Sequence, residues 1–161
     1  MEVWLRDEHG LESPQVNQSR ADQGILLARL SPNEYLFLEK IDDESEVYTS
    51  FVERAHSTPV CESQTQIFYL PRQDSHACFL VRGVNCSLLF SKLCAINFAL
   101  DTFPQGQVAQ TSMARCPVIV IRNDLEDAPA FLLLVDSSFA EYLWDCLAEA
   151  GNEYNIVQSL L

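Results

Sequence analysis

Apolar residues in this chain occur in short runs that polar connections separate. Phe131–Val135 and Cys116–Ile121 are examples, and each has the length of one β-strand. No run approaches the roughly 18 apolar residues that a membrane-spanning helix needs. Runs of this size are buried by pairing in sheets that pack against helices or other sheets. The pattern predicts a fold rich in strands.

Turn residues divide these runs into pairs. Ile25–Leu30 and Tyr35–Leu38 flank a turn that contains Pro32 and Asn33, which is typical of a hairpin. Later runs show either continuous apolar character or partial alternation. The further predicted strands are 66–70, 77–81, 107–113, 116–121 and 131–135.

About three helices are expected among the strands. The acidic stretch Asp42–Glu46 begins an amphipathic segment that runs to residue 55, with carboxylates at the end that the helix dipole favours. Asn85 is a good N-cap for a short helix with apolar residues at helical spacing. Asp136 caps a final helix that Gly151 ends. Its predicted core face comprises Phe139, Tyr142, Leu143, Cys146, Leu147 and Ala150.

The order of these elements predicts an α+β fold with a mainly antiparallel sheet, because regular βαβ alternation is missing. A strand-turn-strand-helix unit at 25–55 recurs at 116–150, which indicates a pseudo-repeat. Residues 1–23 are polar and form a predicted N-terminal arm, either anchored by Trp4 or disordered. Residues 24–161 are predicted to form a single domain.

The net charge and the first residues indicate which partners and which cellular location to expect. The net charge of −13 would repel phosphate backbones and anionic lipids, so we expect neither a nucleic-acid nor a membrane partner. The first residues lack the basic and apolar stretches of a signal peptide. We therefore expect a cytoplasmic protein.

The cysteines and histidines do not have the spacing of a metal site. In a cytoplasmic chain, widely spaced cysteines are expected to be buried, reduced thiols. The residues concerned are Cys61, Cys78, Cys86, Cys94, Cys116, Cys146, His9, His56 and His76. No metal ligand is assigned to this chain.

Candidate catalytic groups all have a simpler structural explanation. Glycine motifs for nucleotides or for a nucleophile elbow are missing. Cys86 starts a helix, but its spacing places it on the buried face. Asp101, Asp124 and Asp127 lie in polar connectors, where aspartate is favoured for making turns. We assign no catalytic and no cofactor-binding residue.

Two tryptophans are the predicted interface residues. Trp144 projects away from the apolar stripe of the last helix, so an aromatic side chain is expected on its polar side. Exposed tryptophans are favoured anchors of protein interfaces. The alternative is that a loop or the N-terminal arm covers Trp144 within the chain. Trp4 is the second candidate, in the arm itself.

Several segments resemble the gamma subunit of heterotetrameric sarcosine oxidase. They are 106–118 (Gly-Gln-Val-Ala-Gln-Thr-Ser-Met-Ala-Arg-Cys-Pro-Val), 136–144 (Asp-Ser-Ser-Phe-Ala-Glu-Tyr-Leu-Trp), the hairpin 30–38 and the strand and helix of 80–93. The resemblance covers roughly 25–150 and leaves residues 1–23 outside.

The resemblance implies a domain related to the folate-binding aminomethyltransferases, used as a non-catalytic structural subunit. The complex would oxidatively demethylate sarcosine or a similar N-methyl amine. Partners would be the alpha, beta and delta type subunits, and these would hold FAD, FMN, NAD, zinc and tetrahydrofolate. When isolated, such a subunit exposes an apolar patch and is expected to self-associate.

One departure bears on chemistry. The related aminomethyltransferases carry an acidic pair soon after their Gln-Thr strand, whereas Val118–Ile121 contains no carboxylate. An aminomethyltransferase-type enzyme is therefore the least favoured of three hypotheses. A free-standing binding module for folate or a methylated amine is the second, after the structural subunit.

Overall fold

The computed structural model describes residues 6–7, 10–22, 24–39, 49–50, 52–53, 68–126 and 128–159. Contacts group the chain into two compact units, Met1–Arg72 and Gln73–Leu161. Each unit is described by itself below. No helix among the described residues is long and apolar enough to cross a membrane.

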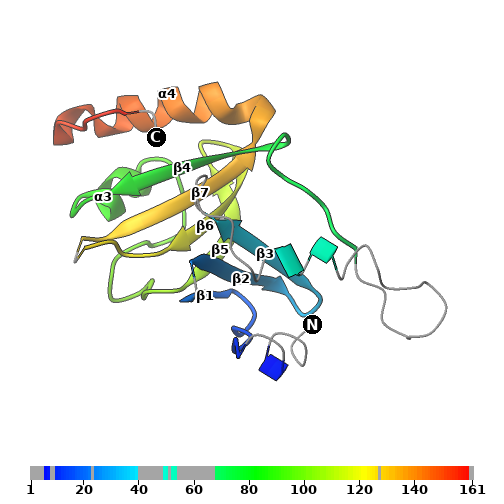
Figure 1. The fold of residues 1–161 in the computed structure, drawn as a ribbon. Coiled ribbons are helices and arrows are strands. Elements are labelled where there is room, and N and C mark those ends of the chain that lie inside the picture. The colour runs from blue at the N-terminus through cyan, green and yellow to red at the C-terminus, as the bar shows by residue number, and fades with distance from the viewer. Residues whose placement is uncertain are drawn as a thin grey trace. The chain divides into compact units, whose positions relative to one another are not determined.

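The first unit contains a three-stranded antiparallel sheet of β1 (Gln18–Asp22), β2 (Ile25–Ser31) and β3 (Glu34–Glu39) (Figure 1). The hairpin predicted around Pro32 and Asn33 is confirmed as β2 and β3. Ile25 and Leu27 of β2 point to one face, where Leu11, Tyr35 and Phe37 pack with them. Burial of this apolar face is the main force that holds the hairpin in register.

Strand β1 lies inside the segment expected to be a polar arm. Its residues are Gln-Ser-Arg-Ala-Asp, and they pair with β2 from Gln18↔Arg29 to Asp22↔Ile25. An edge strand is held by backbone hydrogen bonds on one side, so it needs little apolar character of its own. An ion pair between Arg20 and Glu12 further ties the preceding segment to β1.

The second unit contains a four-stranded antiparallel sheet in the order β4-β7-β6-β5 (Figure 1). The strands are β4 (His76–Arg82), β5 (Val108–Met113), β6 (Cys116–Arg122) and β7 (Ala130–Asp136). A two-residue turn, Ala114–Arg115, joins β5 to β6, and both residues have positive φ, 49° and 70°. This is the backbone of a type I′ turn, whose twist suits a tight hairpin.

Helices cover one face of this sheet. Helix α3 (Cys86–Ser91) and helix α4 (Ala140–Gly151) pack beside each other, and the 3-10 turns η1 (Ser137–Phe139) and η2 (Asn152–Tyr154) flank α4 (Figure 1). Lys92 follows α3 and donates a hydrogen bond of 2.7 Å to the Ala150 carbonyl near the end of α4. This contact satisfies a carbonyl that the helix itself leaves unpaired.

Four phenylalanines form the centre of the core. Phe90 lies against Phe131 with centroids 5.1 Å apart and an interplanar angle of 88°, and Phe98 lies edge-on to Phe103 at 4.9 Å. All four side chains are buried. Edge-to-face contacts of this kind add to the free energy gained from burying the rings.

The face of α4 differs in part from the predicted one. Leu143, Leu147 and Ala150 are buried as expected, but Phe139 and Tyr142 remain 41% and 50% exposed, so their assignment to the core was wrong. Phe139 lies in η1, where the tighter 3-10 winding turns it out of the helical stripe. Tyr142 lies at the edge of the apolar stripe and is only partly covered.

Four further predictions are at most partly borne out by the described residues. The helix predicted from Asp42 lies mostly outside the described residues, although residues 49–50 and 52–53 are helical. Residues 66 and 67 of a predicted strand lie outside as well, and 68–70 are not a strand. The pseudo-repeat stays a prediction, because the helix of its first unit falls on residues outside the described part. The single folding domain over 24–161 also stays a prediction, since grouping of contacts and independent folding are different properties.

Candidate functional site

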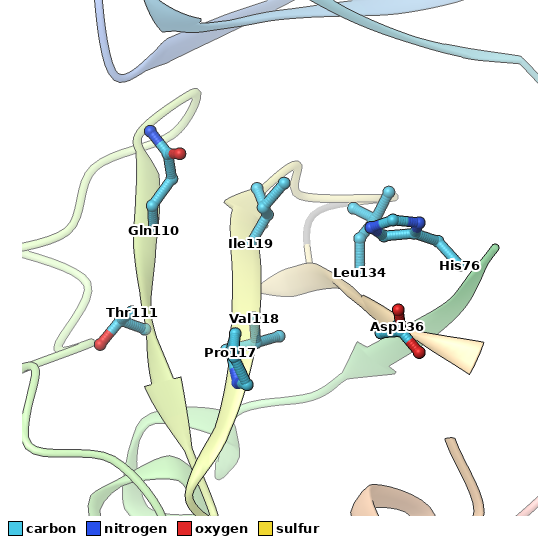
Figure 2. Close-up of a pocket in the computed structure, with 8 residues that line it drawn as sticks. All are labelled: His76, Gln110, Thr111, Pro117, Val118, Ile119, Leu134 and Asp136. Carbon is cyan, nitrogen blue, oxygen red and sulfur yellow. The ribbon is translucent and has the colours of Figure 1, made fainter. Parts of the chain in front are cut away.

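A groove crosses the face of the second sheet that α3 and α4 leave uncovered. Residues alternate along each strand, so Phe79, Val120 and Leu133 contact the helices while their neighbours point the other way. The cavity measures about 400 Å³, which lies at the lower end of the range for small-molecule sites. Its lining residues are His76, Gln110, Thr111, Pro117, Val118, Ile119, Leu134 and Asp136 (Figure 2).

Strand register sets the order of groups across the groove. His76 of β4 is paired with Asp136 of β7, and Leu134, Ile119 and Gln110 form a row across β7, β6 and β5. The groove therefore has a charged end at His76 and Asp136, an apolar floor, and an amide end at Gln110 (Figure 2).

Asp136 performs a structural task at the charged end. Its Oδ1 accepts hydrogen bonds from the Ser138 backbone N–H at 2.9 Å and the Ser138 hydroxyl at 2.5 Å, which makes it the N-cap of η1. These bonds lower the pKa of Asp136, and the nearby His76 lowers it to a smaller extent. The predicted capping role of Asp136 is confirmed, and the carboxylate is ionised at neutral pH.

His76 lies beside a hydroxyl as well as beside Asp136. Its Nδ1 is 2.8 Å from the Ser75 Oγ. An imidazole, a carboxylate and an amide around an apolar floor can hold a small molecule that has polar groups at both ends. Neither His76 nor Gln110 was selected from the sequence as a site residue. The alternation of β5 hinted at Gln110, but the strand register that completes the groove is not visible in the sequence.

Asp124 is not placed as a free general acid or base. Arg122 binds it at two points, with Nε 3.0 Å from Oδ1 and Nη2 2.7 Å from Oδ2. The hydrogen bonds from Arg122 hold the pKa of Asp124 below its ordinary value. Asp101 accepts a hydrogen bond of 3.2 Å from the Thr102 hydroxyl in an exposed turn. Asp127 lies outside the described residues.

Cys86 lies on the buried face of α3, as its spacing predicted. The pKa of its thiol is raised to about 11, mainly by desolvation, while a backbone hydrogen bond lowers it and the charge of Asp124 raises it to smaller extents. A thiol in this state is a poor nucleophile near neutral pH. Cys116 is also a buried free thiol, whereas Cys94 and Cys146 are half-buried and Cys78 is exposed, so the expectation of buried cysteines was wrong for Cys78.

The structure describes one of the two predicted interface tryptophans. Trp144 is half-buried, and its ring lies 5.8 Å from that of Phe79 on β4. A strand of the same unit therefore covers part of it, which is neither the loop nor the arm that was considered. Its role in an interface stays a prediction. Trp4 lies outside the described residues.

Within the described part of the chain, no three His, Cys, Asp or Glu side chains come together as a metal site. The predicted location of zinc and the organic cofactors in partner subunits stays a prediction.

Comparison with known proteins agrees with this architecture. A chain of the heterotetrameric sarcosine oxidase from Corynebacterium sp. U-96, solved with pyrrole 2-carboxylate, matches with a TM-score of 0.76 at 20% identity. The match covers 99% of this chain and 76% of that one. No curated protein matches the sequence.

The fold similarity bears out the expected α+β class with antiparallel sheets and its likeness to the aminomethyltransferases. The sequence comparison identifies a family directly. The model of the GCVT N-terminal domain matches residues 17–159, which is nearly the whole chain. The chain therefore belongs to the family of the GCVT N-terminal domain.

Proposed function

We propose that this chain is a gamma-type, non-catalytic structural subunit of a sarcosine oxidase-like flavoenzyme complex. The observation that carries the proposal is the fold match over 99% of the chain to a chain of heterotetrameric sarcosine oxidase. Because the match covers nearly the whole chain, almost no residues remain that could form a different architecture. In this role the complex oxidatively demethylates sarcosine or a similar N-methyl amine.

The chain's own chemistry supports a structural role. Asp124 is held in an ion pair, and Cys86 is buried with a raised pKa, so the candidates for catalysis have structural tasks. Residues 118–121 alternate between the core and the opposite face of the sheet as apolar side chains. They supply no carboxylate at the place where the related transferases have an acidic pair.

The proposal also assigns partners and a location. Alpha, beta and delta type subunits would surround this chain and hold FAD, FMN, NAD, zinc and tetrahydrofolate. The complex would work in the cytoplasm.

Co-expression tests the proposal. The tagged chain is produced together with the products of its neighbouring genes and purified, and the eluate is examined for subunit composition, flavin absorbance and sarcosine oxidation. Recovery of larger flavin-containing subunits at fixed stoichiometry is expected. A complex of unchanged composition and activity in the absence of this chain would contradict it.

The groove favours a second function, a binding module for a folate or a methylated amine. It offers an ionised carboxylate at Asp136 for an amine and an apolar floor for a ring. Titration calorimetry of the full chain with tetrahydrofolate and with sarcosine tests this function. Saturable heat that Gln110→Ala reduces supports it, whereas the lack of heat with both compounds removes it.

A further inference from the structure

The outward face of α4 carries an uncompensated row of negative charge. Glu141, Asp145 and Glu149 are spaced four residues apart, so they lie in one line along the helix, and all three are exposed. The helix contains no Lys or Arg. Among the described residues, the ion pairs involve other carboxylates, such as Glu153 with Lys92 and Glu126 with Arg82.

This arrangement is unfavourable for the helix on its own. Like charges at a spacing of four residues cost about 0.2–0.5 kcal/mol per pair. The helix dipole favours Glu141 in the first turn but disfavours Glu149 in the last turn. Because no ion pair among the described residues offsets this repulsion, the row of carboxylates points to a contact with another molecule.

Aromatic side chains lie along both edges of the row. Tyr142 is 50% exposed on one edge, with Phe139 at 41% just before the helix. Half-buried Trp144 lies on the other edge, against Phe79. Arg115, in the β5–β6 turn, is close enough for its charge to affect Tyr142, although it forms no ion pair with the three carboxylates.

Carboxylates between aromatic rings match the chemistry of arginine. A guanidinium forms bidentate bonds with carboxylates and stacks on aromatic faces, which an ammonium does less well. A second copy of this chain is a poor occupant, because two acidic faces would repel each other in a protein of net charge −13. Tyr and Trp are among the residues that contribute most to binding at interfaces.

We propose that the outward face of α4, formed by Phe139, Glu141, Tyr142, Trp144, Asp145 and Glu149, docks onto an arginine-rich surface of a larger partner protein. The inference rests on the proposed role as a complex subunit and names the chemistry of the contact. The three carboxylates orient the partner and raise the rate of association, and the aromatic rings contribute the apolar contact area.

The test uses nona-arginine as a probe for the full chain, with binding followed by fluorescence anisotropy in moderate salt. The variant Glu141→Gln/Asp145→Asn/Glu149→Gln is compared with a control of equal charge change, Asp22→Asn/Asp101→Asn/Glu126→Gln, at exposed sites that are not part of α4. The α4 variant is expected to bind about tenfold more weakly, and the control about twofold or less. Tyr142→Ala is expected to weaken binding as well.

Thermal unfolding rules out misfolding as the cause. The α4 variant is expected to melt near the temperature of the wild type, because the repulsion that it removes offsets the favourable charge of Glu141 that it also removes. Equal weakening by both triple variants, or no weakening by the α4 variant, would overturn the inference. Co-expression separates the two proposals. If the α4 variant assembles with the flavin subunits as the wild type does, the docking face is wrong and the subunit role stands.

Discussion

Arg122 and Asp124 form a two-point ion pair, with Nε 3.0 Å from Oδ1 and Nη2 2.7 Å from Oδ2. The remaining arm of the guanidinium donates to the carbonyls of Leu100 and Phe103 at 2.8 and 2.7 Å. Asp124 Oδ1 accepts a further bond from the Ala130 N–H at 3.1 Å. One charged pair thus connects the segment around Phe103 to the ends of β6 and β7.

Arg122→Ala is expected to lower the free energy of unfolding by about 3 kcal/mol, because a partly buried carboxylate and two carbonyls lose the guanidinium as their hydrogen-bond donor. Urea unfolding followed by circular dichroism measures the change. Arg82→Ala is the matched control, since Arg82 pairs with Glu126 on the surface and its loss costs about 1 kcal/mol or less. Equal losses in the two variants would contradict the assigned role of Arg122.

The same pair predicts a pH dependence. Hydrogen bonds from Arg122 lower the pKa of Asp124 from its ordinary value of 3.8. A carboxyl with a lowered folded-state pKa stabilises the fold above its unfolded value and loses this effect as the pH falls through the folded value. The difference in stability between wild type and Asp124→Asn is expected to be constant from pH 7 to about pH 5 and to shrink below about pH 4.

Urea unfolding of both proteins from pH 7 to pH 3 measures that difference. Asp101→Asn is a useful reference, because Asp101 is exposed and has no arginine partner among the described residues. A gap between wild type and Asp124→Asn that stays constant down to pH 3 would show that Arg122 does not stabilise the ionised form.

Much of the fold could be predicted from the sequence, because buried residues recur with the period of a strand or a helix. The hairpin of β2 and β3, the strands β4 to β7 and both helices of the second unit follow from apolar runs and turn residues. Strand β1 left no trace, since Gln18–Asp22 is polar and is held by pairing with β2. The exposed position of Phe139 was missed because a 3-10 turn interrupts the helical period.

The core predicts a large effect at Phe90. This side chain is fully buried between Phe98 and Phe131, at centroid distances of 5.4 and 5.1 Å. Phe90→Ala is expected to cost about 3–5 kcal/mol of unfolding free energy, from lost burial and the cavity that remains. Leu88→Ala on the same helix is the control, because Leu88 is 56% exposed and should change stability little. A comparable loss at Leu88 would contradict this packing.

Cys86 is expected to resist alkylation in the folded protein. With a pKa raised to about 11 by desolvation, about one thiol in a thousand is ionised at pH 8. Labelling with iodoacetamide at pH 8, followed by peptide mass spectrometry, should modify Cys86 only after denaturant is added. Labelling of Cys86 in the native protein as fast as in the denatured protein would overturn this assignment.

The candidate site was less accessible to sequence reasoning than the fold. Asp136 was found, but only as a helix cap, since capping is a local signal. His76 and Gln110 lie on strands at opposite edges of the sheet, and only the order β4-β7-β6-β5 brings them to one groove. Strand order depends on long-range pairing, which local residue patterns do not encode.

Residues 92–106 have neither helix nor strand, and many of their side chains are exposed, yet this stretch places two phenylalanines in the core. Phe98 and Phe103 are buried, and Arg122 holds the carbonyls of Leu100 and Phe103. Proteases cut a native chain only where several residues can detach as extended backbone. Residues 92–106 cannot detach without removing Phe98 and Phe103 from the aromatic cluster. Limited digestion should therefore spare this stretch, and the amide proton of Phe103, which donates to the Ala99 carbonyl, should exchange only in the same rare events that open the sheet.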